Sequence, residues 1–213
     1  MSRAERIAHA VASGHTRDDW VYVVTDIETD GPHPGANSMR SFASVAARAD
    51  GSVVGEFEAV LEPLPGAAPN PDTLAWFRTQ PPSVWAAATE GARPVPQVLA
   101  EYTAWVATLG HRRVFAAAPL AFDGTWMDYY LRRFTPYGLC QGPYEDDVLF
   151  TGRALCLRSY AAAVLGLPMA ETPTSVELPA GWLGDVEHTH RAIDDARGFA
   201  HLLGVLTQKA GAR

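Results

Sequence analysis

Cysteine is almost absent from this chain. Its two cysteines, Cys140 and Cys156, form neither a CxxC pair nor a zinc-ligand spacing, so neither a disulfide framework nor a cysteine zinc site is expected. Long apolar runs are missing too: no window approaches the roughly 18 apolar residues of a membrane span, and the first residues lack the apolar stretch of a signal peptide. These absences predict a cytoplasmic protein without membrane contact.

Positive charge is also scarce. The chain has 24 acidic residues against 17 Lys and Arg, which gives a formal net charge of −7. A protein that grips a duplex without regard to sequence needs many contacts from basic side chains to phosphates, so this charge argues against such binding. Nucleic acid remains compatible as a substrate, because divalent ions bound to carboxylates reverse the local charge. The net negative charge favours contact with only a few nucleotides at the end of a nucleic-acid strand.

The chain is long enough for one substantial core, since 47% of its 213 residues are hydrophobic and only 19% are charged. No internal repeat or low-complexity tract indicates a second domain. Residues 1–18 are expected to form an N-terminal helical extension, because Ile7, Ala8 and Val11 have helical spacing. Residues 19–213 are expected to form the single domain.

Strands come first in the domain and then alternate with helices. The apolar run 20–26 predicts a strand buried on both faces, and Asp50-Gly51 predicts a hairpin between the next two strands. Strands are expected at 20–26, 41–48, 53–61, 113–118 and 154–157, and helices at 72–80, 83–89, 95–109, 123–134, 159–165 and 191–209. This order predicts an α/β fold with helices packed on a mixed sheet.

Asp26 and Glu28 end the first predicted strand. Side chains at i and i+2 of a strand point to the same face, so the two carboxylates can share a cation. Hard ions such as Mg²⁺ or Mn²⁺ prefer carboxylate oxygens, and ligands bind at the carboxyl ends of strands in open sheets. Taken alone, the pair is better explained as two acidic residues in a loop after a strand, so the metal-site hypothesis needs further residues.

Asp123 stands at the start of a predicted helix, directly after a predicted strand. The residue is a candidate ligand at the same edge of the sheet. Asp is also a preferred helix N-cap, and capping alone could explain its position.

The last predicted helix brings one of two adjacent aspartates to its buried side. Its apolar residues gather on one face, and Asp195 falls at the edge of that face whereas Asp194 points toward solvent. Asp195 is therefore the candidate ligand, although a charge at a helix start is also stabilised by the helix dipole. His190, just before this helix, can face the same site or be a solvated residue.

Three segments together resemble a known family. Thr25–Gly31 (Thr-Asp-Ile-Glu-Thr-Asp-Gly), Phe122-Asp123 and His190–Ala196 (His-Arg-Ala-Ile-Asp-Asp-Ala) are similar, in order and spacing, to the three exonuclease motifs of the DnaQ-like superfamily, in its RNase T-type, DEDDh branch. The resemblance spans about Val21 to Leu203. It implies an RNase H-like fold, a mixed five-stranded sheet flanked by helices. Pro119 departs from the pattern, because many members carry an Asn there.

A further segment, Pro71–Gln80, is similar to a Thr-Leu-x-Trp-(Trp/Phe)-x-x-Gln stretch of some bacterial and phage exonucleases of this superfamily. Leu74, Trp76 and Phe77 would equally suit a helix packed on the core, and we prefer that interpretation.

The resemblance implies a two-metal-ion nuclease. Asp26, Glu28 and Asp195 would bind one Mg²⁺ or Mn²⁺ ion, Asp26 would bridge to a second ion, and Asp123 would hold that ion through water. Two ions can stabilise both the attacking and the leaving oxygen, and His190 would take the proton from the attacking water. The implied products are a nucleoside 5′-monophosphate and a shortened strand.

Contacts to the terminal nucleotide are harder to assign. Backbone groups near the metal ligands and side chains that could pack on a base give the candidate substrate-binding set Ile27, Thr29, Gly31, Met39 and Trp126. Arg40 and Arg158 are candidate phosphate partners, with solvated arginine as the alternative.

We therefore expect a 3′-to-5′ exonuclease that acts on the 3′ ends of single-stranded nucleic acid, with short RNA favoured. The alternatives are a DNA exonuclease of repair or proofreading, a nuclease-like binding module without activity, and a two-metal phosphatase of small molecules. A homodimer is possible, because homodimers recur among the small exoribonucleases that the chain resembles.

Overall fold

The computed structural model describes residues 5, 19–139, 147–185 and 189–212. The predicted N-terminal helix falls outside these residues apart from Glu5, and Cys140 lies outside them as well. Within the described part of the chain, no helix combines the length and the apolar character needed to cross a membrane.

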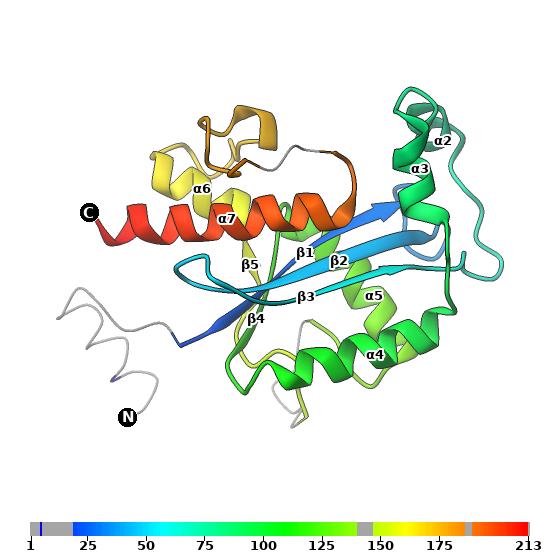
Figure 1. Cartoon of the computed structure of the whole chain (residues 1–213), viewed down its shortest axis with the longest axis horizontal. Coiled ribbons are helices and arrows are strands. Elements are labelled where there is room, and N and C mark those ends of the chain that lie inside the picture. Colours follow the sequence, from blue (N-terminus) through cyan, green and yellow to red (C-terminus); the bar gives the residue numbers. More distant parts are fainter. Residues whose placement is uncertain (1–4, 6–18, 140–146, 186–188, 213) are drawn as a thin grey trace.

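The core of the molecule is a mixed five-stranded sheet, as predicted. Its strand order is β3-β2-β1-β4-β5. The strands are β1 (Val21–Thr29), β2 (Met39–Arg48), β3 (Val53–Val60), β4 (Arg113–Ala117) and β5 (Leu155–Cys156). The first three are antiparallel neighbours, and β4 and β5 run parallel to β1 (Figure 1).

Local sequence explains the antiparallel part of the sheet. The predicted Asp50-Gly51 hairpin is present: Gly51 has φ 85°, a conformation that glycine adopts without steric cost, and its N–H donates to the Arg48 carbonyl at 2.9 Å. Strand β1 lies in the middle of the sheet because its apolar side chains alternate between two cores. Val23 and Ile27 face one core and Val24 faces the other.

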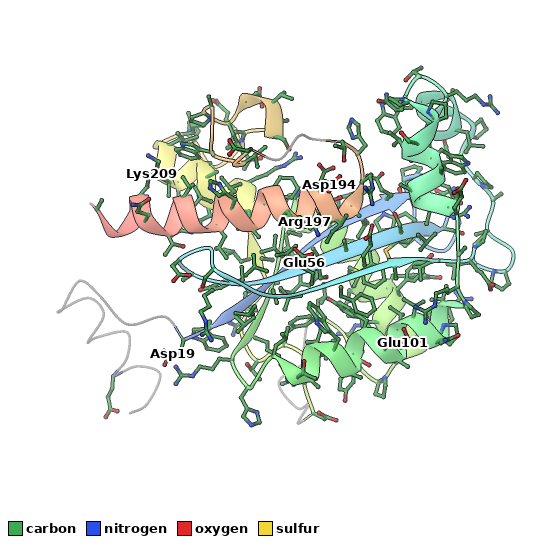
Figure 2. All side chains as sticks on the ribbon, viewed as in Figure 1. Asp19, Glu56, Glu101, Asp194, Arg197 and Lys209 are labelled. Carbon is green, nitrogen blue, oxygen red and sulfur yellow. The ribbon has the colours of Figure 1, made fainter. Side chains whose placement is uncertain are left out.

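Helices cover both faces of the sheet. On one face, α4 (Val95–Thr108) and α5 (Thr125–Phe134) pack over one apolar core, and on the other, α6 (Leu157–Leu165) and α7 (Ala192–Gly211) pack over a second (Figure 1). On the outer side of α7, Arg197 pairs with Glu56 of β3 at 2.7 Å and with Asp194 at 3.5 Å (Figure 2). The long helix α7 packs against β1, the strand that carries the candidate ligands Asp26 and Glu28.

Two short helices, α2 (Pro71–Phe77) and α3 (Pro82–Thr89), lie beyond the end of β1 (Figure 1). Asn70 caps α2, because its side-chain oxygen accepts from the N–H groups of Asp72 at 2.9 Å and Thr73 at 3.1 Å. The Asn70 N–H in turn donates to the Asp30 carbonyl at 2.7 Å. This bond ties α2 to Asp30 of the first motif.

The helix predicted from residue 123 begins differently. Residues Leu120–Gly124 form a wider π-helical turn, η1, and the α-helix α5 follows from Thr125. The Pro119 carbonyl accepts from the N–H groups of Phe122 and Asp123, each at 3.2 Å, so the turn starts from Pro119. A short 3-10 turn, η2 (Ser175–Glu177), was not predicted.

Candidate metal and active site

Strand β1 presents two carboxylates on one face. Asp26 and Glu28 lie opposite Ala43 and Ser41 of β2, and both are half-buried. Val24 points to the same face and packs in the core beneath α7, while Ile27 points to the other core. The strand alternation thus places both carboxylates under the start of α7, as expected for residues at i and i+2.

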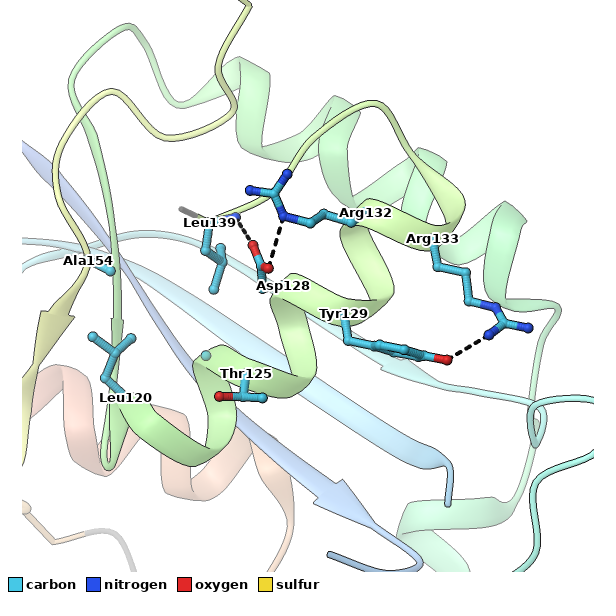
Figure 3. A pocket seen from close by; sticks show the side chains of 9 residues that line it. Leu120, Thr125, Asp128, Tyr129, Arg132, Arg133, Leu139 and Ala154 are labelled. Carbon is cyan, nitrogen blue, oxygen red and sulfur yellow. Dashed lines mark hydrogen bonds and ion pairs between the residues drawn. The ribbon is translucent and has the colours of Figure 1, made fainter. Parts of the chain in front are cut away.

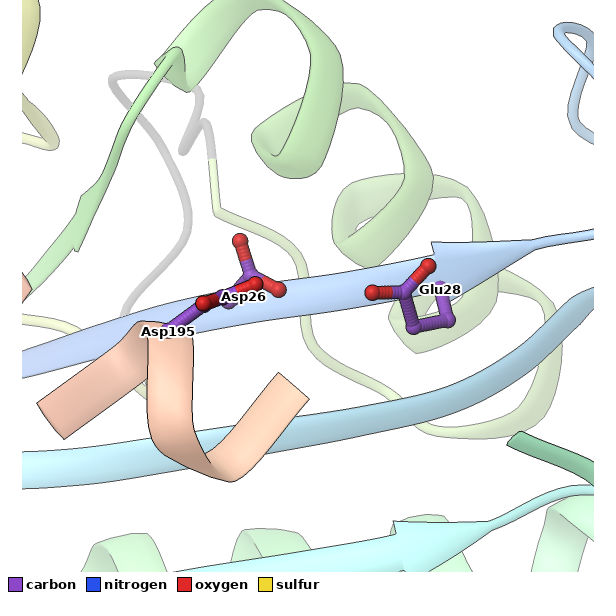
Figure 4. A group of neighbouring side chains, drawn as sticks. All are labelled: Asp26, Glu28 and Asp195. Atoms are coloured by element: carbon purple, nitrogen blue, oxygen red, sulfur yellow. The ribbon is translucent and has the colours of Figure 1, made fainter. Parts of the chain in front are cut away.

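The third carboxylate comes from the first turn of α7. Asp195 is 5% exposed, and one ligand oxygen each of Asp26, Glu28 and Asp195 lie within 4.8 Å of one another. Figure 4 shows the Asp195 side chain extending from α7 toward Asp26 on β1. The helix N-terminus also favours negative charge at this position. Three carboxylates distant in the sequence therefore converge on one point.

The neighbouring aspartate faces outward. Asp194 accepts from the Thr189 hydroxyl at 2.8 Å and lies 3.5 Å from Arg197 and 3.9 Å from Arg191. The helix geometry thus separates the two adjacent aspartates, with Asp195 at the cluster and Asp194 in an ion-pair network on the outer side of the helix.

Asp123 is the fourth buried carboxylate. It sits in the π-helical turn, is 4% exposed, and its Oδ2 atom has no hydrogen-bond partner among the described residues. The cap of α5 is Gly124 without a side-chain hydrogen bond, so helix capping does not explain Asp123. Its charge raises the pKa of both Asp26 and Glu28, which places it close to these two carboxylates. A buried carboxylate oxygen without a partner is costly unless a cation or its water shell satisfies it.

The pKa values show how strongly these groups interact. Burial and the charges of Asp123, Glu28 and Asp195 hold the pKa of Asp26 well above its usual range. Burial, followed by the charges of Asp195 and Asp123, raises the pKa of Glu28 to about 8. Burial also raises the pKa of Asp123 to about 8, although Arg158 and a hydrogen bond with the Ala118 backbone act in the opposite direction. Asp26, Glu28 and Asp123 all carry a negative charge together only beside a strong positive charge.

This donor set fits a divalent cation. Carboxylate oxygens are the ligands that hard ions such as Mg²⁺ and Mn²⁺ prefer, and three of them already lie within 4.8 Å. Among the described residues, the cationic side chain that lowers the pKa of Asp26 and Asp123 is that of Arg158 in α6. One such side chain cannot balance the charge of four carboxylates, whereas a divalent cation adds two positive charges.

His190 precedes α7 by two residues, so the backbone places it at the same end of the sheet as Asp195. Its φ of 57° is left-handed, a region that non-glycine residues seldom adopt and in which His is enriched. Its imidazole packs edge-to-face on the Trp76 ring of α2, with centroids 5.0 Å apart and planes at 89°. The histidine is thus half-buried between two elements.

Comparison with known proteins adds the fold family. No protein-family model and no curated protein matches the sequence. Among solved structures, the nuclease domain of 3′hExo, a DEDDh family member bound to rAMP, is 13% identical with a TM-score of 0.64, over 90% of this chain and 94% of that one. A 3′-exonuclease in a structure of histone mRNA stem-loop recognition is 11% identical with a TM-score of 0.63, over 91% of this chain and 84% of that one.

The third neighbour is E. coli exonuclease I in complex with a dT13 oligonucleotide. It is 15% identical with a TM-score of 0.62, over 90% of this chain and 42% of that one. This chain thus spans less than half the length of exonuclease I. The chain has the fold of the DEDDh 3′-exonucleases.

The carboxylates and histidine of the DEDDh pattern now have defined places in this fold. Asp26 and Glu28 lie on the central strand, Asp123 in the turn after β4, and His190 and Asp195 at the start of α7. This is the order in which the sequence motifs appear. The mixed sheet flanked by helices, which the DEDDh resemblance implied, is confirmed.

The candidate substrate contacts need correction. Met39 is 0% exposed and Trp126 1% exposed, and Ile27 is also buried in the same core cluster, so none of the three offers its side chain to a base. The Met39 N–H donates to the Tyr130 hydroxyl at 2.7 Å. The sequence left the direction of Trp126 open, and the packing of α5 against the sheet turns it inward.

The turn after β1 holds the other two candidates. The Thr29 hydroxyl donates to the Gly31 carbonyl at 2.9 Å. A Cβ at Gly31 would meet the Asn37 side chain at 2.2 Å, so only glycine fits there. Both residues stand close in the backbone to the candidate metal ligands Asp26 and Glu28, and their contact with substrate stays a prediction.

A groove of about 610 Å³ runs along α5, beside the turn that carries Asp123 (Figure 3). Its described lining includes Leu120, Thr125, Tyr129 and Leu139. None of the four carboxylates lines it among the described residues. The groove is therefore adjacent to the carboxylate cluster but separate from it.

One residue that sequence reasoning placed in the core is instead exposed. Phe77 is buried as expected, but Trp76 is 40% exposed and contacts His190. The helical spacing gave no signal for this, because adjacent positions about 100° apart can both face a core, as Leu202 and Leu203 of α7 do.

Proposed function

We propose that this chain is a metal-dependent 3′-to-5′ exonuclease of the DEDDh type. The proposal is carried by the convergence of Asp26, Glu28 and Asp195 within 4.8 Å, on the fold of the DEDDh 3′-exonucleases. The buried, unpartnered oxygen of Asp123 supports a second point of metal attachment. A capping or solvated role for these residues would require neither convergence nor raised pKa values.

The residues divide the chemistry between them. Asp26, Glu28 and Asp195 would hold one divalent ion, and Asp26 and Asp123 would hold a second. Bound divalent ions would supply positive charge for the attacking and leaving oxygens of the scissile phosphate. His190 accepts the proton of the attacking water, a role suited to a group that titrates near neutrality.

The proposed substrate is the 3′ end of a short single strand, with RNA favoured. The net charge of −7 supports a small footprint, because extended binding needs many basic contacts to phosphates. The neighbours include a nuclease bound to rAMP and one bound to a dT13 oligonucleotide. DNA is therefore the alternative polymer that the test includes.

Matched RNA and DNA oligonucleotides test this proposal. Each is labelled at its 5′ end and incubated with the protein and Mg²⁺ or Mn²⁺, and a second set carries a 3′-phosphate as a block. We expect a ladder of progressively shorter labelled strands, release of nucleoside 5′-monophosphates, faster cleavage of RNA than of DNA, and slower cleavage of the blocked set. Hydrolysis of mononucleotides with intact oligonucleotides would indicate a phosphatase. Binding without cleavage would indicate an inactive nuclease-like module.

A further inference from the structure

The aromatic side chain of Trp76 contacts His190, the proposed general base. The His190 imidazole meets the Trp76 ring edge-to-face at 5.0 Å, an arrangement that the charge distribution of aromatic rings favours. Trp76 belongs to none of the carboxylate motifs and is 40% exposed, so burial alone does not account for its position. The contact joins α2 to the residue just before α7.

The Trp76 indole is held in place by a series of side-chain contacts. Trp76 packs on Phe77 at 4.9 Å between centroids, and Phe77 packs on Trp85 of α3 at 4.7 Å. The Arg40 guanidinium lies 5.7 Å from the Trp85 ring centroid and 3.6 Å from the Asp30 carboxylate. The indole therefore packs on an aromatic cluster, Phe77 and Trp85, which is linked through Arg40 to Asp30 of the first motif.

The backbone of α2 is fixed to the same place. The Asn70 N–H donates to the Asp30 carbonyl at 2.7 Å, and the Asn70 side chain caps α2. Asp30 follows the metal-binding Glu28 by two residues. The first motif, the aromatic cluster and Trp76 are thus connected through direct contacts, and Trp76 in turn contacts His190.

The imidazole needs such support. His190 has a left-handed backbone, and its side chain can rotate about two torsions. A general base works only when its nitrogen is within hydrogen-bond reach of the attacking water, and a misplacement of about 1 Å can cost roughly 100-fold in rate. A ring fixed relative to the metal ligands restricts the imidazole to one orientation.

We propose that Trp76 is a positioning residue that holds the His190 imidazole in its catalytic orientation. This inference rests on the proposed exonuclease function. Trp76 acts through His190 and not through the substrate, so its loss affects kcat and leaves KM nearly unchanged. Its effect also depends on the presence of His190.

The test is a double-mutant cycle on oligonucleotide cleavage. Trp76→Leu keeps an apolar side chain without a ring, and Trp76→Phe keeps an aromatic ring; each is made in the natural protein and in a His190→Ala background. We expect Trp76→Leu to lower kcat by roughly 10- to 100-fold, Trp76→Phe to recover most of it, and Trp76→Leu to change nothing further in His190→Ala. Circular dichroism and Mn²⁺ binding should match the natural protein in every variant.

Other outcomes overturn the inference. A raised KM with an unchanged kcat would make Trp76 a substrate contact, and an equal loss in both backgrounds would make it a structural residue. If the chemical shifts of the His190 ring protons are the same in the natural protein and in Trp76→Leu, the two rings are not in contact in solution. If the natural protein cleaves no oligonucleotide, the proposed function fails; if it cleaves and the cycle is additive, only the positioning role fails.

Discussion

The metal-free protein should lose stability as the pH rises from about 5 toward 8. Glu28 and Asp123 each have a pKa of about 8 in the folded state, against ordinary values of 4.5 and 3.8. Between these limits the folded protein binds more protons than the unfolded chain, so the stabilising contribution is complete below about pH 4 and is lost as the pH passes 8. Each such proton changes the free energy of unfolding by about 1.4 kcal/mol per pH unit.

Asp123→Asn isolates one of these protons. The amide is nearly isosteric and cannot ionise, so the slope of stability against pH should fall by about 1.4 kcal/mol per pH unit or more relative to the natural protein. Titrating groups away from the carboxylates are common to both proteins and cancel in the difference, whereas the loss of the Asp123 charge also lowers the pKa of Asp26 and Glu28 and adds to the decrease. The variant should be the more stable of the two at pH 8 without metal.

Urea unfolding in EDTA at half-unit steps from pH 5 to 8 measures both slopes. Saturating Mn²⁺ should restore stability to the natural protein at pH 8, by about 2.7 kcal/mol at 100 times the dissociation constant. The same addition should restore less to Asp123→Asn. A flat or rising profile for the metal-free protein, or equal slopes for the two proteins, would refute the reasoning about the buried carboxylates.

Three further predictions concern the same end of the molecule. His190→Ala should lower kcat by roughly 10²- to 10⁴-fold with Mn²⁺ binding intact, measured by steady-state cleavage and calorimetry; loss of metal binding would contradict its role as a base. Asp195→Asn should abolish metal-dependent cleavage while Asp194→Asn keeps it, and the opposite result would reverse the assignment. Asn70→Ala should cost about 1 kcal/mol in urea unfolding through the lost cap of α2, and no change would show that the cap is not needed.

Most of the fold could be predicted from local pattern. Strand β1 is a continuous apolar run, and α7 has apolar residues at helical spacing along one face. The Asp50-Gly51 dipeptide indicates the hairpin between β2 and β3. The predicted start of α5 was wrong by two residues, Asp123 instead of Thr125. The π-helical turn at Leu120–Gly124 has no periodic signature, because it is set by hydrogen bonds to the carbonyl of Pro119.

Part of the candidate site could also be predicted from local pattern, and part could not. Strand alternation and the helical wheel placed Asp26, Glu28 and Asp195 correctly on faces, because a face follows from backbone periodicity alone. Whether a side chain points to the interior or to a cleft also depends on which element packs against it. That is why Trp126 and Met39 were placed at the substrate but lie in the core. The contact of Trp76 with His190 joins residues more than a hundred positions apart and had no local signal.

Cleavage of a 5′-labelled single strand by the natural protein, Asp26→Asn and Asp194→Asn tests the central claim most directly. The pair is matched, since each variant replaces one aspartate by its amide and only Asp26 belongs to the converging carboxylates. The account predicts a ladder with the natural protein and Asp194→Asn that requires Mg²⁺ or Mn²⁺, disappears in EDTA and is absent with Asp26→Asn. Undiminished cleavage by Asp26→Asn, or cleavage in EDTA, would contradict it.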